Sequence, residues 1–104
     1  MFNKRIENFE KLNKMQDIIL KACEIIKSTL DNGNKILLCG NGGSASDCNH
    51  IAAEFVSRFQ KERISLPAIS LSANNSVISA IANDYSFEKV FSRQIEGLGK
   101  KGDI

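Results

Sequence analysis

The strongest constraint on the fold is an apolar run that passes directly into a glycine-rich turn and then into a helical pattern. The run KILLC (Lys35–Cys39) is bounded by turn residues, which is typical of a strand buried on both faces in a parallel sheet. The turn Gly40–Gly43 follows, and Ser44 can cap a helix from Ala45 to Phe59. A strand that enters a helix through such a turn predicts an α/β fold.

The same order of elements repeats further along the chain. A second apolar run, Ala68–Leu71, leads through a Ser/Asn-rich turn into a helical pattern that contains Val77 and Ile81, and Phe87–Leu98 predicts another amphipathic helix. Asp103–Ile104 has the character of the start of a third strand. The alternation predicts a right-handed three-layer α/β sandwich, of which this chain holds a part, because two strands do not make a sheet of usual width.

The N-terminal segment predicts a long amphipathic helix. Apolar residues recur three and four positions apart from Phe9 to Leu30, with a break expected near Asn13. Ile18 and Ile25 widen the apolar stripe beyond what one neighbour needs. Two interpretations are therefore equally open: the helix covers its own sheet, or it also packs against a second chain.

Composition excludes several classes of function. The chain has 104 residues and a net charge of +2, which is too small and too dispersed to attract nucleic acid or an anionic membrane. It contains neither an apolar run long enough to span a bilayer nor a secretion signal, so we expect a cytoplasmic protein. Three cysteines without a C-x-x-C pair predict reduced, mostly buried thiols.

The glycine-rich turn predicts a site for a polar small molecule, although the same turn also forms without a ligand. Glycines let the backbone approach a ligand closely, and the free N–H groups of a first helical turn favour anionic or oxygen-rich groups. The pattern Gly40-x-Gly42-x-x-Ala45 also matches the dinucleotide fingerprint. However, the segment 72–75 after the second strand lacks the acidic residue that holds a ribose, and no lysine follows the glycines as in a P-loop.

Two further pairs of residues are candidates for chemistry. His50 and Glu54 lie four residues apart, on a helix face turned away from the apolar one, where an imidazole and a carboxylate can bind zinc or place a general base. The same spacing occurs on ordinary solvated helix faces, but the position just beyond the glycine turn favours a site. Asn83 and Asp84 either present another carboxylate to the same crevice or simply end a helix.

Several blocks of the sequence resemble one family. CGNGGSASDCNHIAAEFVSRF, LPAISL and SAIANDYSFEKVFSRQIEGLGKKGD resemble sugar isomerase (SIS) domains, specifically the sedoheptulose-7-phosphate or phosphoheptose isomerases. The resemblance runs from Lys35 to the last residue, with compatible helices before it. It implies a flavodoxin-like parallel sheet, incomplete here, in residues 35–104, and an N-terminal helical segment, residues 1–34, that packs between the subunits of a homotetramer.

The resemblance also implies an aldose–ketose isomerisation. The substrate would be sedoheptulose 7-phosphate and the product D-glycero-D-manno-heptose 7-phosphate, a precursor of lipopolysaccharide or capsule heptose. Glu54 would be the base that moves a proton between C1 and C2 through an enediol, and it would bind zinc together with His50. The residues expected to contact the substrate are Asn41, Gly42, Gly43, Ser44, Glu54, Asn83 and Asp84.

The sequence departs from this family in one important respect. Family members continue for about as long again, and that half supplies the phosphate loop, the remaining zinc ligands and a histidine general acid. This chain has a single histidine, so we expect the 104 residues to be inactive by themselves. The alternative is a non-catalytic SIS scaffold that binds the bacterial replication initiator. Those scaffolds lack a carboxylate at the position of Glu54, which favours the isomerase.

Overall fold

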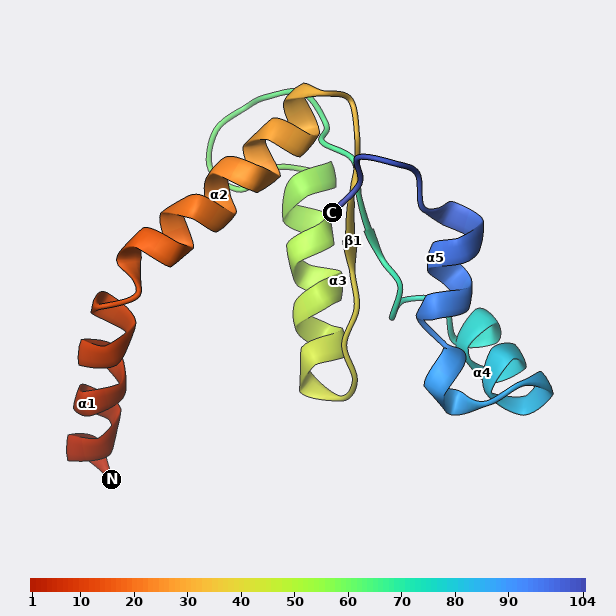
Figure 1. Cartoon of the computed structure of the whole chain (residues 1–104), viewed down its shortest axis with the longest axis horizontal. Coiled ribbons are helices and arrows are strands. Elements are labelled where there is room, and N and C mark those ends of the chain that lie inside the picture. Colours follow the sequence, from red (N-terminus) through yellow and green to blue (C-terminus); the bar gives the residue numbers. More distant parts are fainter.

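The computed structural model describes residues 1–104 and places two short parallel strands at its centre (Figure 1). Strand β1 is Ile36–Leu38 and strand β2 is Ala68–Ser70. Ile36 lies opposite Ala68, and Leu38 lies opposite Ser70. Both predicted strands and their parallel pairing are therefore confirmed, with ends one residue shorter than the apolar runs suggested.

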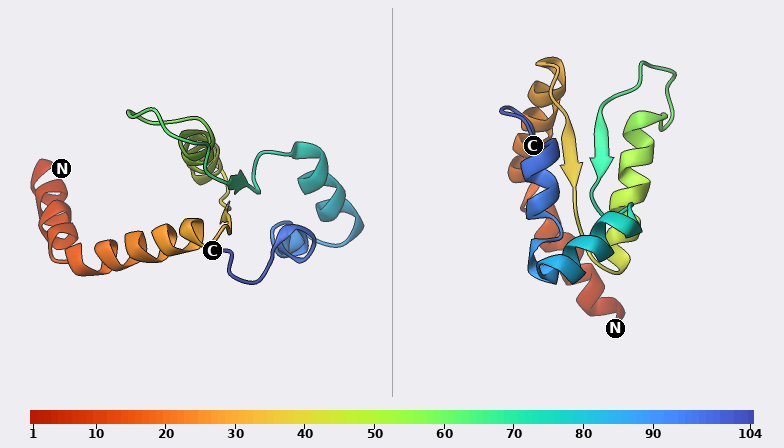
Figure 2. Two further views of the ribbon diagram at one scale, coloured as in Figure 1. Left: turned by 90° about the horizontal axis from the view of Figure 1, so that it is seen from above. Right: turned by 90° about the vertical axis from the view of Figure 1, so that its right-hand side faces the viewer.

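Helices cover both faces of this sheet. Figure 2 shows α2 (Gln16–Asp31) and α3 (Gly43–Val56) on one face, with α4 (Asn75–Asp84) and α5 (Ser92–Leu98) on the other. The predicted three-layer α/β architecture is confirmed, as is the incomplete sheet. None of the helices combines the length and the apolar character that crossing a membrane requires.

The core is divided between the two sides of the sheet. On the side of α2 and α3, Ile36, Ala52 and Ala68 form a buried cluster, against which partly buried apolar residues of α2, β1 and α3 pack: Ile26, Leu30, Leu38 and Phe55. On the side of α4 and α5, Leu71 and Val90 are the most completely buried side chains, with exposures of 1% and 2%. These contacts fix α3 against the strands and so fix the direction in which it leaves the glycine turn.

The N-terminal region consists of two helices rather than one. Helix α1 (Phe2–Asn13) ends where the sequence predicted a break, and Lys14 and Met15 join it to α2. Helix α1 buries none of its residues and extends away from the sheet (Figure 1). The two helices leave a row of large apolar side chains more than two-fifths exposed: Phe2, Ile6, Phe9, Leu12, Met15, Ile18, Ile19, Leu20 and Ile25.

The structure corrects the prediction of a continuous helix from Phe87 to Leu98. A 3-10 turn, η1 (Phe87–Lys89), comes first and α5 begins only at Ser92. A continuous helix would place Phe87 and Val90 on one face. In the structure Val90 is buried, whereas Phe87 is 56% exposed.

Two smaller predictions about side chains were also wrong. Ser44 does not cap α3, because the helix already begins at Gly43 and its N-cap is Gly42, which has no side chain to offer. The cysteines are all free thiols, but only Cys48, which faces the sheet from α3, is buried. Cys23 and Cys39 are exposed.

The end of the chain pairs with the free edge of β1. Ile104 donates its N–H to the carbonyl of Lys35 at 3.2 Å, and Leu37 donates to the carbonyl of Ile104 at 2.7 Å. These two bonds have the pattern of parallel pairing at Ile104, although the sheet itself has two strands and residues 103–104 are not assigned to a third. β1 is thus hydrogen-bonded on both edges, but the prediction of a strand buried on both faces was too strong, because only Ile36 of its three residues is buried.

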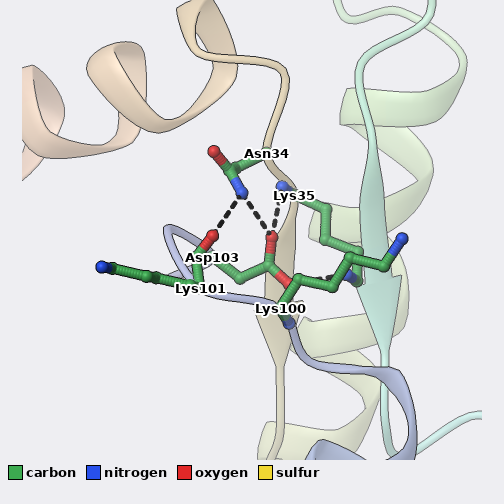
Figure 3. Close-up of polar contacts among 5 residues, drawn as sticks. All are labelled: Asn34, Lys35, Lys100, Lys101 and Asp103. Carbon is green, nitrogen blue, oxygen red and sulfur yellow. Dashed lines mark hydrogen bonds and ion pairs between the residues drawn. The ribbon is translucent and has the colours of Figure 1, made fainter.

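Asp103 holds this third segment in place (Figure 3). Its carboxylate accepts hydrogen bonds from the backbone N–H groups of Lys35 and Lys100, at 3.0 and 2.7 Å, and lies 2.5 Å from the Lys35 ammonium. The Asn34 amide donates to the same carboxylate. The side-chain bond from Lys35, followed by the backbone bond from the same residue, holds the pKa of Asp103 well below its ordinary value of 3.8.

We therefore predict that Asp103→Asn lowers the melting temperature by a few degrees at pH 7. A carboxylate with a depressed pKa in the folded state stabilises the fold above its unfolded pKa and loses that contribution as the pH falls. The difference between wild type and variant should accordingly shrink below about pH 4. Thermal unfolding followed by circular dichroism from pH 7 to pH 2 measures it.

Asp31→Asn is the matched control for this prediction. Asp31 pairs with Lys27 at 2.6 Å, but both side chains are largely exposed, at 62% and 77%. Exposed pairs one helical turn apart contribute little to stability. A melting temperature that responds equally to both substitutions, or a difference for Asp103→Asn that persists unchanged at pH 2, would contradict the role assigned to Asp103.

Candidate functional site

The glycine turn lies at the carboxyl end of β1 and leads directly into α3 (Figure 1). A Cβ atom on Gly40 would lie 2.7 Å from the Cβ of Ser44 and 2.9 Å from its carbonyl carbon, so only glycine allows the strand end to approach the first turn of the helix. Gly42 adopts a φ of +57°, in the left-handed region that favours glycine. The backbone itself therefore requires glycine at these two positions.

The predicted substrate-contacting residues of this turn are accessible. Asn41, Gly42, Gly43 and Ser44 are all exposed. The turn is held by its own hydrogen bonds, with Ser44 donating its N–H to the Asn41 carbonyl and Ala45 donating to the Gly42 carbonyl, each at 3.1 Å. It is thus a shaped and exposed surface at the start of a helix, where oxygen-rich groups are favoured.

His50 and Glu54 lie side by side on α3, as their spacing predicted. His50 Nε2 is 3.0 Å from Glu54 Oε1, with 77% of the histidine side chain and 32% of the glutamate side chain exposed. Ala52, between them in sequence, faces the opposite way and is buried against the sheet. Imidazole nitrogen and carboxylate oxygen are both ligands that zinc accepts, so this pair fits two positions of a zinc site.

The chain does not complete such a site by itself. Nowhere does it bring together three histidine, cysteine, aspartate or glutamate side chains in positions to hold a metal ion. Zinc in proteins usually has three or four protein ligands. Further ligands for a zinc ion at His50 and Glu54 would therefore have to come from residues outside this chain.

Glu54 also borders an open cavity of about 400 Å³ at the end of α3. Its other lining residues are Phe55, Phe59, Arg63 and Leu66. Glu54 is therefore a predicted site residue that the fold places beside a concavity. Neither His50 nor the exposed residues of the glycine turn line this cavity.

Arg63 has a structural role that was not predicted from the sequence. Its guanidinium donates to the backbone carbonyls of Glu54, at 2.6 Å, and Phe55, at 3.0 Å, which satisfies carbonyl groups at the end of α3. An arginine shortly after the last helical turn is the signal that could have indicated this. Arg58, which could have paired with Glu54, instead pairs with Glu62 at 3.1 Å.

Asn83 and Asp84 lie apart from the other candidates. They are the last two residues of α4, which covers the opposite face of the sheet from α3 (Figure 2). Both side chains are exposed, and the Asn83 amide donates to the Asp84 carboxylate at 3.2 Å. The cavity beside Glu54 is lined neither by Asn83 or Asp84 nor by the glycine turn. Their contact with a substrate stays a prediction.

Comparison with known proteins identifies the family. A family model described as the SIS domain matches residues 2–104, which is nearly the whole chain. The chain belongs to the SIS domain family. The helices α1 and α2 fall inside the matched range.

Relatives of this SIS domain chain include phosphoheptose isomerases. The chain is 48% identical over 103 residues to a phosphoheptose isomerase from Helicobacter hepaticus, and 56% identical over 99 residues to one from Nitratiruptor. These matches cover 99% and 94% of this chain but 53% of each relative. The chain thus spans about half the length of the relatives it matches.

Solved structures show the same likeness in three dimensions. A phosphoheptose isomerase from Neisseria gonorrhoeae superimposes with a TM-score of 0.88 at 39% identity, over 98% of this chain and 53% of that one. A phosphoheptose isomerase from Francisella tularensis gives a TM-score of 0.78 at 30% identity, over 99% of this chain and 59% of that one. The arrangement of helices and strands described above is therefore that of the SIS fold.

The contacts of the glycine turn predict that alanine substitutions at Gly40 and Gly43 have different effects on stability. Gly40→Ala should lower the free energy of unfolding by about 1–3 kcal/mol, because the new methyl group would overlap backbone atoms of Ser44 that cannot move away freely. Gly43→Ala is the control, since a Cβ there meets nothing within 4 Å. Alanine at this first helical position should be neutral, or stabilising by up to about 1 kcal/mol. Urea unfolding of the two variants should rank them in this order, and the reverse order would refute the close approach.

Proposed function

We propose that this SIS domain chain is the N-terminal half of a phosphoheptose isomerase. The reaction would interconvert sedoheptulose 7-phosphate and D-glycero-D-manno-heptose 7-phosphate, toward the heptose of lipopolysaccharide or capsule. The observation that carries the proposal is the placement of the Glu54 carboxylate. It lies 3.0 Å from the His50 imidazole, on the helix α3 that starts at the glycine turn and toward the other end of that helix. Relatives of the same name and about half-identical sequence support it.

The chemistry follows from the groups that this chain supplies. Glu54 would take the proton from C1 of the ketose and return it to C2, so that the substrate passes through an enediol. With 32% of its side chain exposed, the Glu54 carboxylate is accessible to a ligand. The exposed turn from Asn41 to Ser44 would hold the sugar, and Asn83 and Asp84 would hold its hydroxyl groups.

We propose zinc as the cofactor, with His50 and Glu54 as two of its ligands. The donor types fit, and the two atoms already lie 3.0 Å apart on one helix face. When bound, such an ion supplies positive charge that stabilises the oxygen charge developing in an enediolate. The remaining ligands and the general acid would come from the half of the isomerase that this chain does not contain.

The proposed substrate is a sugar phosphate, and the proposed location is the cytoplasm, where phosphorylated sugars are made and consumed. The other proposed partners are further copies of the chain in a homotetramer, and not nucleic acid or membrane. Exposed apolar side chains on α1 and α2 support the homotetramer. On α1, Phe2 and Phe9 are each 72% exposed and Ile6 is 56% exposed, and no residue of this helix is buried within its own chain.

Turnover tests the proposed activity. The extended chain, defined as residues 1–104 followed by the second half of the Helicobacter hepaticus phosphoheptose isomerase, should interconvert the two heptose phosphates. The 104 residues alone should not. In the extended chain, Glu54→Gln should lower turnover by about 100- to 10,000-fold, because the general base is lost. Proton NMR in heavy water measures turnover and shows the solvent deuterium that enters at C2.

Matched controls make this experiment specific. Glu62→Gln makes the same chemical change at an exposed position paired only with Arg58, and should leave turnover unchanged. His50→Gln should weaken zinc binding measured by titration calorimetry. If the extended chain shows no turnover but captures the bacterial replication initiator, the chain belongs to the non-catalytic scaffolds and the isomerase proposal is wrong.

The oligomeric state tests the role of the N-terminal helices. Phe9→Asp in the extended chain should shift the tetramer toward smaller species, because it places a charge in the exposed apolar row of α1. Asn8→Asp introduces the same charge one residue away, off that row, and should leave the assembly intact. Light scattering coupled to size-exclusion chromatography measures the mass. A tetramer that withstands Phe9→Asp would contradict the proposed packing.

A further inference from the structure

The parallel ladder between β1 and β2 is interrupted where the glycine turn begins. Ile36 donates its N–H to the carbonyl of Pro67 at 3.0 Å, and Leu71 donates to the carbonyl of Leu38 at 2.8 Å. At the same register, the N–H of Gly40 should donate to the carbonyl of Leu71. It does not: it donates to the hydroxyl of Ser72 at 3.1 Å.

Ser72 makes a second bond to the same glycine. Its hydroxyl donates to the carbonyl of Gly40 at 2.6 Å, so one side chain binds both polar groups of the residue at which the turn leaves the strand. Ser72 itself is only 8% exposed. A buried hydroxyl that both accepts and donates holds its partner in one position, because losing it would leave two backbone groups without a partner.

The Leu71 carbonyl that the ladder leaves free is bound from the other side of the sheet. The Gln94 side chain of α5 donates to it at 2.9 Å, and donates also to the carbonyl of Val90 at 2.8 Å. Leu71 is 1% exposed, so the residue preceding Ser72 is fixed by both packing and hydrogen bonding. Ser72 is therefore attached to a rigid part of the core and not to a mobile loop.

We propose that Ser72 is a positioning residue, which acts through Gly40 to set the place of the substrate-binding turn Asn41–Ser44 relative to Glu54. This inference rests on the proposed isomerase function. The turn and Glu54 sit at opposite ends of α3, and Gly40 joins that helix to the sheet with no side chain of its own to anchor it. The hydroxyl of Ser72 supplies the anchor.

The proposal predicts a specific kinetic effect in the extended chain. Ser72→Ala should raise the KM for sedoheptulose 7-phosphate about three- to tenfold, the effect of losing hydrogen bonds that hold a binding group in place. The kcat should change less, because Glu54 and its surroundings are untouched. Ser72→Thr keeps the hydroxyl and should restore a KM near that of wild type. Ser79→Ala, which removes an exposed hydroxyl bonded only within α4, should change neither constant.

Amide hydrogen exchange tests the anchor independently of turnover. In Ser72→Ala the Gly40 amide should exchange faster, while the Leu71 amide, bonded inside the ladder, should keep its wild-type rate. NMR exchange measurements on the extended chain resolve both amides. If the wild-type extended chain lacks turnover, the proposed function fails, and an unchanged Gly40 exchange rate in Ser72→Ala would overturn the anchor as well.

The two measurements together decide the role. Faster exchange at Gly40 with a raised KM that threonine restores supports the proposal. Faster exchange with unchanged KM shows that the bonds are structural only and overturns the positioning role. An unchanged exchange rate overturns it regardless of the kinetics. Equal loss of protection at Gly40 and Leu71 would mean general loosening of the sheet, which also contradicts it.

Discussion

Hydrogen bonds on both edges of β1 determine where the glycine turn and the helices lie. This three-residue strand, Ile36–Leu38, pairs with β2 on one edge and with Ile104 on the other. Its position between two neighbours fixes the direction in which the chain leaves its carboxyl end. Asp103 secures the second edge by binding backbone and ammonium groups at the start of β1. Without that alignment neither the glycine turn nor α3 would have a defined place.

The candidate site is built from two kinds of constraint. The glycine turn is required by contact distances, since a side chain on Gly40 would collide with the backbone of Ser44. The His50–Glu54 pair is required by helix geometry, since residues four apart share a face. The first constraint brings the backbone close to the helix start, and the second puts an imidazole and a carboxylate on the same face of the helix.

The distribution of exposed apolar side chains sets this chain apart from a domain whose faces are all covered. Phe2, Phe9 and Phe59 are each more than 70% exposed, and Glu54 borders an open cavity lined by aromatic rings. Apolar surface of this extent is favourable only when something covers it. In the proposed isomerase, further copies and the second half of the fold would provide that cover, and they would also bring the missing groups to Glu54.

The sequence by itself determined the strands, the glycine turn and the pairing of His50 with Glu54, because each depends on local pattern or on helix periodicity. Tertiary structure alone decided the interruption of the predicted helix at Phe87–Lys89 and the hydrogen bonds between Gly40 and Ser72, thirty-two residues away. It also decided that Asn83 and Asp84 lie across the sheet from α3. Such features depend on which distant segments of the chain come into contact, and a local sequence pattern does not contain that information.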